Sequence, residues 1–421
     1  MRSKRLPTLR LCSVLGRRGT YGKVRESSES VCIVRDSNEV VRASNHVMIR
    51  LGASFLRASQ YAFPRRPCSP ICYETKGGPR PAGRVSRLPD EQYLAARASI
   101  IETIADFRKG EIEPRTEAHV DEWAEQFDAE IRSGLLHELA SVLGSTYLSR
   151  SHIDAFLDRH LAMLAKISDK GPALFQEFNF LDIQTKGDSQ SHLLTVLDER
   201  LQELFNFSLN DCGSDCGMNV YLDDILFSGN TVQNDLKRWL QDDAPDAASV
   251  QVWLAHGHSL GLYFMESGVR EAMEVEDRGL TLQAPLVGQR SKNNASRSRE
   301  SDVLWPRSSP ASAEDFLSTQ SKEPRLRAGD NKSARFEGEA SRSLLEGQFL
   351  EAGLMMWGAC ESPRKMMRPL GYGPFGFGFG AVIATYRNCP NNAPLALWWG
   401  GPFDEGPPLR KLATAVAEAG E

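Results

Sequence analysis

The sequence predicts an α/β fold with a doubly wound parallel sheet, preceded by an N-terminal helical unit and completed by a C-terminal Gly/aromatic strand. Three observations predict this fold. Short apolar runs alternate with stretches of helical period in residues 169–282, polar loops follow two of these runs, and a longer helical pattern precedes them. Such alternation is typical of parallel sheets with right-handed crossovers, in which ligands bind outside the carboxyl ends of the strands.

Residues 88–168 are predicted to form a helical unit of three or four helices. Their N-caps are expected at Asp90, Thr116 and Ser151, since short polar side chains there precede apolar residues of helical period. The apolar positions fall in three groups: Leu94, Ile100, Ile101, Ile104 and Phe107; Trp123, Phe127, Ile131, Leu135, Leu136 and Leu139; Ile153, Phe156, Leu157, Leu161 and Leu164.

Residues 169–282 are predicted to form the core of the α/β domain. Three stretches have the composition of buried strands, and each is followed by a segment of helical period. The expected strands are 178–183, 218–224 and 249–254, and the expected helices are 192–205, 232–240 and 261–273.

The stretch Met218–Thr231 carries the strongest functional signal. Its apolar run ends in the adjacent carboxylates Asp223 and Asp224, which are followed by a small-residue loop at the start of a helix. Such loops bind phosphate, because first-turn N–H groups have no intrahelical partner and carry the positive end of the helix dipole. Gly229 is expected to let the backbone approach a ligand. Both carboxylates are expected to face solvent and to accept hydrogen bonds from a sugar diol.

This run of residues resembles the signature of the phosphoribosyltransferases with the type I fold. In that family two acids hold the ribose 2′- and 3′-hydroxyls, and a Thr/Ser-Gly-x-Thr loop binds the 5′-phosphate of 5-phosphoribosyl 1-diphosphate. The resemblance implies catalytic roles for Asp223 and Asp224. Phe227 stands where several purine-salvage members carry an acidic base, so base chemistry of that kind is not implied here. The implied phosphate-binding residues are Ser228, Gly229, Asn230 and Thr231.

A polar loop, Thr185–Ser191, follows the strand predicted at 178–183. The resemblance implies that this loop binds the diphosphate, with Lys186 as a catalytic cation and with Gly187, Ser189 and Ser191 as binding residues. It also implies Mg²⁺, held indirectly by the two acids through the ribose and the diphosphate. A polar loop with one lysine is equally compatible with an ordinary surface loop.

A second resemblance lies in residues 344–421, which are predicted to complete the α/β domain. The Gly-aromatic run 371–380 leads into a strand-like segment, 381–386, and then into Asn-Cys-Pro-Asn-Asn and the pair Trp398 and Trp399. This order resembles the phosphoribosyltransferase-like domain of bacterial conflict (anti-phage) systems. Asn391 and Asn392 either read a base or form a turn, and the two tryptophans also fit an ordinary core.

Composition limits the class of protein. Hydrophobic content of 41 % and charged content of 25 % are typical of a globular protein. No run approaches the roughly 18–20 apolar residues of a membrane span, so we expect no membrane partner. The formal net charge of −5 argues against a nucleic-acid partner. Cys212 and Cys216 have no histidines at zinc-site spacing, and scattered cysteines favour a reduced, cytoplasmic protein.

Two other segments have distinct compositions. Residues 1–87 are basic and poor in periodic pattern, and they are interpreted as a disordered or non-native extension that includes Cys68 and Cys72. Residues 283–343 are a polar insertion with an apolar island at 302–306. A hood or lid over the substrate and a disordered loop both fit this insertion.

The sequence leaves several functions open. The first is transfer of phosphoribose to a nitrogen acceptor in a bacterial conflict system, with partner proteins encoded in the same operon. The alternative is a non-catalytic nucleotide-sensing or regulatory module that binds a nucleoside monophosphate in the same pocket, and a third is a toxin-like effector. Whether the protein is an enzyme therefore stays open. His256 and His258 follow a predicted strand; they either contact a ligand or belong to a solvated turn.

Overall fold

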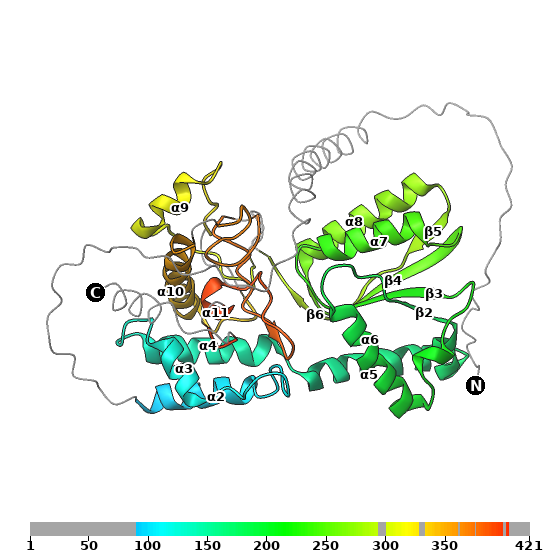
Figure 1. Cartoon of the computed structure of the whole chain (residues 1–421), viewed down its shortest axis with the longest axis horizontal. Helices are drawn as coiled ribbons and strands as arrows, with labels where there is room; N and C mark the ends of the chain where they lie inside the picture. Colours follow the sequence, from blue (N-terminus) through cyan, green and yellow to red (C-terminus); the bar gives the residue numbers. More distant parts are fainter. Residues whose placement is uncertain are drawn as a thin grey trace, which may run out of the picture. The chain divides into compact units, whose positions relative to one another are not determined.

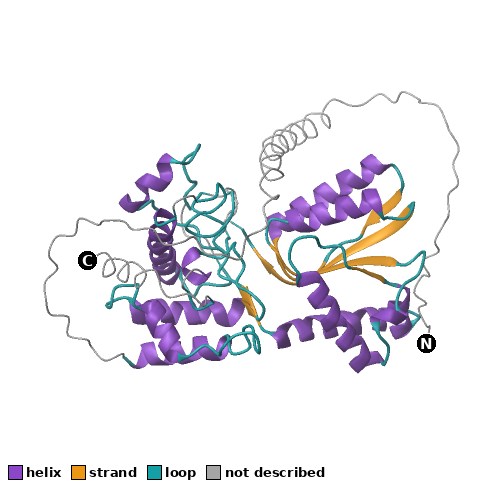
Figure 2. Cartoon of the chain, in the orientation of Figure 1, coloured by secondary structure: helices purple, strands orange, loops and turns teal. Residues whose placement is uncertain are grey.

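The computed structural model describes residues 90–293, 300–327, 333–360, 363–374, 376–398 and 401–403 (Figures 1 and 2). The predictions for residues 1–87, with Cys68 and Cys72, and for Trp399 lie outside these ranges. No helix within the described ranges is long and apolar enough to cross a membrane.

The N-terminal part of the described chain is helical. Its helices are α2 (Glu91–Thr103), α3 (Glu117–Ala124), α4 (Arg132–Thr146) and α5 (Arg150–Ile167). Asp90 caps α2 by accepting the backbone N–H of Tyr93 at 2.7 Å, and Thr116 caps α3. The expected cap at Ser151 is wrong, because Ser149 caps α5 by accepting the N–H of His152 at 3.2 Å.

A five-stranded sheet forms the centre of the α/β part, and every strand pair in it is parallel. The order is β2-β3-β4-β5, and β6 also pairs with β4, along its carboxyl half. An α/β fold with a parallel sheet, as predicted from the sequence, is therefore confirmed. The strands are β2 (Asn179–Leu181), β3 (Met218–Leu226), β4 (Ala247–His258), β5 (Gly279–Leu282) and β6 (Leu286–Ser291).

Helices cover both faces of this sheet (Figure 1). Along β3, Val220 and Leu222 pack in one cluster with α5 and α6, whereas Tyr221 packs with α7 and α8 on the other face. Alternation along a strand produces this division. The helices that connect the strands are α6 (Ser189–Phe205), α7 (Asn230–Asp242) and α8 (Ser259–Glu276).

The order of the strands has a consequence for the crossovers. The chain steps in one direction from β2 to β3 to β4, yet α6 and α7 lie on opposite faces. Parallel crossovers that step the same way on opposite faces have opposite hands, so one of the two is left-handed. The expectation that all crossovers are right-handed is therefore wrong for this sheet.

The predicted polar insertion, residues 283–343, contains more regular structure than its composition suggests. Strand β6 falls inside the predicted polar insertion, and the island residues Val303, Leu304 and Trp305 are buried. The remaining helices are α9 (Glu314–Ser318), α10 (Glu339–Gly358) and α11 (Leu395–Trp398), with 3₁₀ turns at Gly171–Glu177, Leu209–Asp211 and Ala311–Ala313.

The predicted C-terminal strand is much shorter than expected. Only Ala384–Thr385 forms a strand, β7, and it pairs with β1 (Tyr147–Leu148) rather than with the five-stranded sheet. The Gly-aromatic run is irregular because Gly371, Gly378 and Gly380 adopt positive φ angles that a β-strand does not contain. Its Phe379 is nevertheless buried against the sheet core.

Candidate ribose-phosphate site

A crevice is expected between the carboxyl ends of β2 and β3. The chain leaves β2 toward α6 on one face and leaves β3 toward α7 on the other. Ligand sites of open parallel sheets lie at the point where neighbouring connections diverge in this way. Both loops singled out in the sequence, Thr185–Ser191 and Ser228–Thr231, follow these two strands.

The expectation that the strand ends at the two acids is wrong, because β3 continues past them to Leu226. Asp223 is 5 % exposed and Asp224 is half-buried, so the expectation that both carboxylates face solvent is wrong. The Oδ1 atom of Asp223 accepts the Ser189 hydroxyl at 2.9 Å and the backbone N–H of Asp224 at 2.9 Å. The Ser189 contact joins the first turn of α6 directly to the acid pair.

The environment of the acid pair favours protonation. Burial raises the pKa of Asp223 well above its ordinary value, and the charge of Asp224 raises it further, against the hydrogen bond from Ser189. Burial also raises the pKa of Asp224, opposed by the N–H of Ile225 and by the positive charge of Arg387. Two adjacent buried carboxylates without a bound cation therefore hold a proton between them more readily than exposed ones do.

The loop after β2 is shaped by two glutamines. The fully buried Gln190 accepts the backbone N–H groups of Ile183 and Gln184, at 2.7 and 2.9 Å. In return, the Oε1 atom of Gln184 accepts the backbone N–H of Gln190 at 3.1 Å and lies 3.0 Å from the Ser189 hydroxyl. Side chains thus satisfy backbone groups that a loop would otherwise leave without partners.

The other predicted residues of this loop lie in varied surroundings. Lys186 is exposed and has no hydrogen bond or ion pair within the described ranges. Gly187 adopts φ +91°, which favours glycine, and Ser191 donates to Asp182 at 2.8 Å rather than to an acid of β3. Of the predicted diphosphate-binding side chains, the structure brings Ser189 to the acid pair.

The loop after β3 packs tightly on the start of α8. Gly229 adopts φ +78°, and a Cβ atom there would lie 2.4 Å from the carbonyl oxygen of Gly261. Glycine is therefore required at position 229 by the backbone conformation and by close packing on α8. These reasons add to the close approach of a ligand that was expected from the sequence. Ser228 and Asn230 are half-buried beside it, and Thr231 is exposed on the first turn of α7.

The two histidines are buried, so the interpretation of a solvated turn is wrong. His256 and His258 are 0 % and 1 % exposed and belong to the last residues of β4. Burial lowers the pKa of His258 to about 4 and that of His256 well below its ordinary value. Phe227 stacks on His258 with ring centroids 5.0 Å apart, and Phe379 meets both rings edge-on.

A cation from the C-terminal segment reaches this site. Arg387 donates from Nη1 to the carbonyl oxygen of Asp188 at 3.2 Å, and Tyr386 hydrogen-bonds His192 on the first turn of α6. Neither residue was predicted to have a role in the site. Arg387 lies two residues after the short strand β7, and no sequence pattern there could have identified it.

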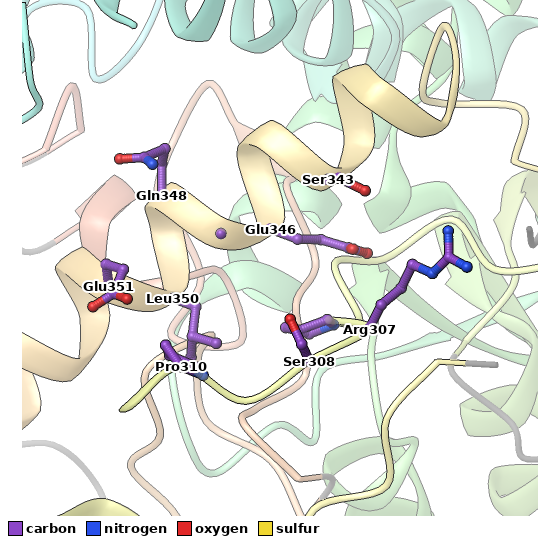
Figure 3. Close-up of a pocket in the computed structure, with 10 residues that line it drawn as sticks. Arg307, Ser308, Pro310, Ser343, Glu346, Gln348, Leu350 and Glu351 are labelled. Carbon is purple, nitrogen blue, oxygen red and sulfur yellow. The ribbon is translucent and has the colours of Figure 1, made fainter. Parts of the chain in front are cut away.

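A cavity near the surface lies away from this site. Its volume is about 240 Å³, and it lies between α10 and the segment 306–310 (Figure 3). None of its lining residues belongs to the loops after β2 and β3. Arg307, Glu346 and Glu351 give it charges of both signs. It is not a part of the candidate ribose-phosphate site.

The donor set at the acid pair suits one class of metal ion. No group of three His, Cys, Asp or Glu side chains in the described ranges is arranged to hold a metal. Mg²⁺ usually keeps several waters and takes only one or two carboxylates together with phosphate oxygens of a substrate. Asp223 and Asp224 fit that indirect mode and do not form a complete protein cage.

The five-stranded parallel sheet with helices on both faces is consistent with a phosphoribosyltransferase-like α/β protein. The comparison of sequences agrees: the model of the PRTase-CE family matches residues 120–405, more than half of the chain, and the chain belongs to this family. PRTase-CE is a phosphoribosyltransferase-like domain of conflict systems, as the second resemblance suggested. No curated protein and no solved structure matches the chain.

Proposed function

We propose that this protein binds a ribose 5-phosphate ligand at the carboxyl ends of β2 and β3. The ligand is 5-phosphoribosyl 1-diphosphate or a nucleoside monophosphate. Asp223 and Asp224 accept hydrogen bonds from the ribose hydroxyls, and the loop Ser228–Thr231 binds the 5′-phosphate at the start of α7. The observation that carries the proposal is the 2.9 Å contact between Ser189 and Asp223, because it joins the loop after β2 to the acid pair of β3.

The loop after β2 is assigned to the C1 side of the ligand. Gly187, Ser189 and Ser191 supply backbone and hydroxyl donors there, and Lys186 supplies a positive charge from the exposed rim. Mg²⁺, when bound through the ribose and the diphosphate, would neutralise charge on the departing group. Preorganised donors aimed at developing charge are worth about 2–4 kcal/mol each in such sites.

Two functions share this pocket. In the first, a nitrogen acceptor attacks C1 of the ribose, the bond from C1 to the diphosphate breaks, and phosphoribose is transferred within a conflict system. The second is nucleotide sensing without transfer. Phe227 packs against His258 and Phe379. Its side chain favours sensing, because a phenyl ring has no group that could accept a proton from an acceptor base.

Isothermal titration of the full chain with 5-phosphoribosyl 1-diphosphate and Mg²⁺ tests the pocket. Since Asp223 is buried, the informative variant is Asp223→Asn/Asp224→Asn, which keeps the size of both side chains. We expect micromolar binding that the variant loses by at least roughly 100-fold, as two charge-assisted hydrogen bonds disappear. Equal binding by variant and parent, with both folded, would exclude this pocket.

Product analysis separates the two functions. Release of diphosphate in the presence of a nitrogen acceptor indicates transfer. Binding of a nucleoside monophosphate, without release of diphosphate from any acceptor, indicates sensing. Protein partners encoded in the same operon are expected to respond to the bound state in the second case.

A further inference from the structure

Arg387 is presented to the candidate site by a rigid backbone. The hydroxyl of Thr385 accepts the backbone N–H of Arg387 at 3.2 Å. The neighbouring Tyr386 donates its N–H to Leu148 at 2.8 Å and accepts the N–H of Arg108 at 2.6 Å. The backbone directly after β7 is therefore held by three hydrogen bonds, and little ordering of this backbone is required when Arg387 binds a ligand.

The side chain of Arg387 is held much less firmly than its backbone. Its Nη2 atom lies 3.5 Å from Oδ2 of Asp188, and the side chain of Asp188 is 75 % exposed. Exposed ion pairs of this kind contribute little to stability. Asp188 immediately precedes Ser189, which donates to Asp223. Arg387 thus lies beside the loop after β2, with a partner that a stronger anion can replace.

We propose that Arg387 binds the diphosphate group on C1 of the ribose ligand and leaves the carboxylate of Asp188 as it does so. This inference rests on the proposed function, since it assumes the ribose 5-phosphate site. A guanidinium carries forked donors that match phosphate oxygens, whereas an ammonium acts as a point charge. Arg387 is also more enclosed than Lys186, with a side chain only 21 % exposed.

Two ligands distinguish this role in titrations of the full chain with Mg²⁺. One is 5-phosphoribosyl 1-diphosphate, and the other is ribose 5-phosphate, which lacks the diphosphate. We expect Arg387→Gln to weaken binding of the first by roughly tenfold or more, because a charge-assisted hydrogen bond is lost. Binding of ribose 5-phosphate should change less than about twofold, within the range of indirect effects. Arg159→Gln, which removes an exposed arginine of α5, is the charge control and should change neither.

Several outcomes would overturn the inference. An equal loss for both ligands would mean that Arg387 acts on the acid pair and not on the diphosphate. Unchanged binding of 5-phosphoribosyl 1-diphosphate would exclude a role altogether. If the parent binds ribose 5-phosphate and the diphosphate adds no affinity, this inference fails while the proposed function stands. If the parent binds neither ligand, this inference fails, and the proposed function fails with it when a nucleoside monophosphate does not bind either.

A double-mutant cycle tests the exchange of partners. Asp188→Asn removes the competing carboxylate, so affinity for 5-phosphoribosyl 1-diphosphate should rise about twofold or more when Arg387 is intact. The rise should vanish in Asp188→Asn/Arg387→Gln, and a rise that persists there would contradict the exchange. Arg387→Lys serves if Arg387→Gln does not fold, and it should bind with intermediate affinity because it keeps charge without the fork.

Discussion

The acid pair and the ion-pair cluster on α10 are both buried, but only the second is compensated. Asp223 and Asp224 lie side by side with like charges, and burial raises the pKa of each. Glu346 instead accepts Arg342 at 2.7 Å and Arg327 at 2.8 Å, and all three side chains are at most 3 % exposed. Glu346 is therefore bonded directly to two guanidinium groups, whereas the charge of Arg387 acts on Asp224 from a distance.

The difference separates a site from a structural clamp. Buried ion pairs with complete hydrogen bonding hold elements in a fixed arrangement. Here the cluster also ties α10 to Trp305, because the backbone N–H of Trp305 donates to Glu346 at 2.8 Å. An uncompensated pair of carboxylates is costly unless a ligand supplies donors or a cation. On the proposed function the acid pair receives these from the ligand, whereas the α10 cluster already has its bonded cations.

The largest effect is expected when the compensated cluster is broken. Glu346→Ala leaves Arg342 and Arg327 without a shared carboxylate in the interior, which should cost about 3–5 kcal/mol of unfolding free energy. Urea denaturation at pH 7 measures it. Glu351→Ala, on the same helix but bonded to the exposed Ser312, is the matched control. A cost no larger than the control's would contradict the clamp.

A second variant sharpens that test. In Arg342→Met/Glu346→Met one positive and one negative charge are removed together, and Arg327 keeps its two hydrogen bonds to Glu339. We expect the double variant to be more stable than Glu346→Ala, because no buried charge is left without a partner. The same stability in both would mean that shape, and not charge, decides the cost.

The half of the candidate site that a sequence pattern can indicate is local in the chain. An apolar run, two acids and a small-residue loop lie within fourteen residues, so their pattern survives any error in topology. The burial of Asp223 was not predictable in the same way, because it depends on Ser189 from another strand connection. The left-handed crossover and the Gly-aromatic segment also escaped prediction, since long-range packing overrides local pattern there.

Arg387 shows the same limit from the other side. It reaches Asp188 across about two hundred positions of sequence, and no periodicity connects the two. The N-cap of α5 is a smaller example. Ser149 and Ser151 are equally good capping residues by type, and only the extended backbone of Ser149 selects it.

The uncompensated pair is expected to make stability fall with rising pH. The pKa of Asp223 is raised above its ordinary 3.8, so the folded protein holds a proton that the unfolded chain releases. Unfolding free energy should therefore decrease as pH rises above about 4. Asp223→Asn removes this loss, and the variant should be more stable than the parent at pH 8 and similar at pH 4. Thermal unfolding across that range measures it, and a parent that gains stability from pH 4 to 8 relative to the variant would refute the assignment.

The smallest expected effect has the opposite sign and comes from the edge of the compensated cluster. Arg327 lowers the pKa of Glu339 from 4.5 to about 2, so its contribution is present above pH 4.5 and is lost as pH falls toward 2. Glu339→Gln should reduce only this loss of unfolding free energy at acid pH. The effect should be small, because Glu339 is 30 % exposed and solvent screens the pair. Acid unfolding of both proteins measures the difference. Asp223→Asn is expected to change the pH dependence of the unfolding free energy above pH 4, and Glu339→Gln below it. If both substitutions changed the slope of unfolding free energy against pH in the same direction, the two clusters would not differ in compensation.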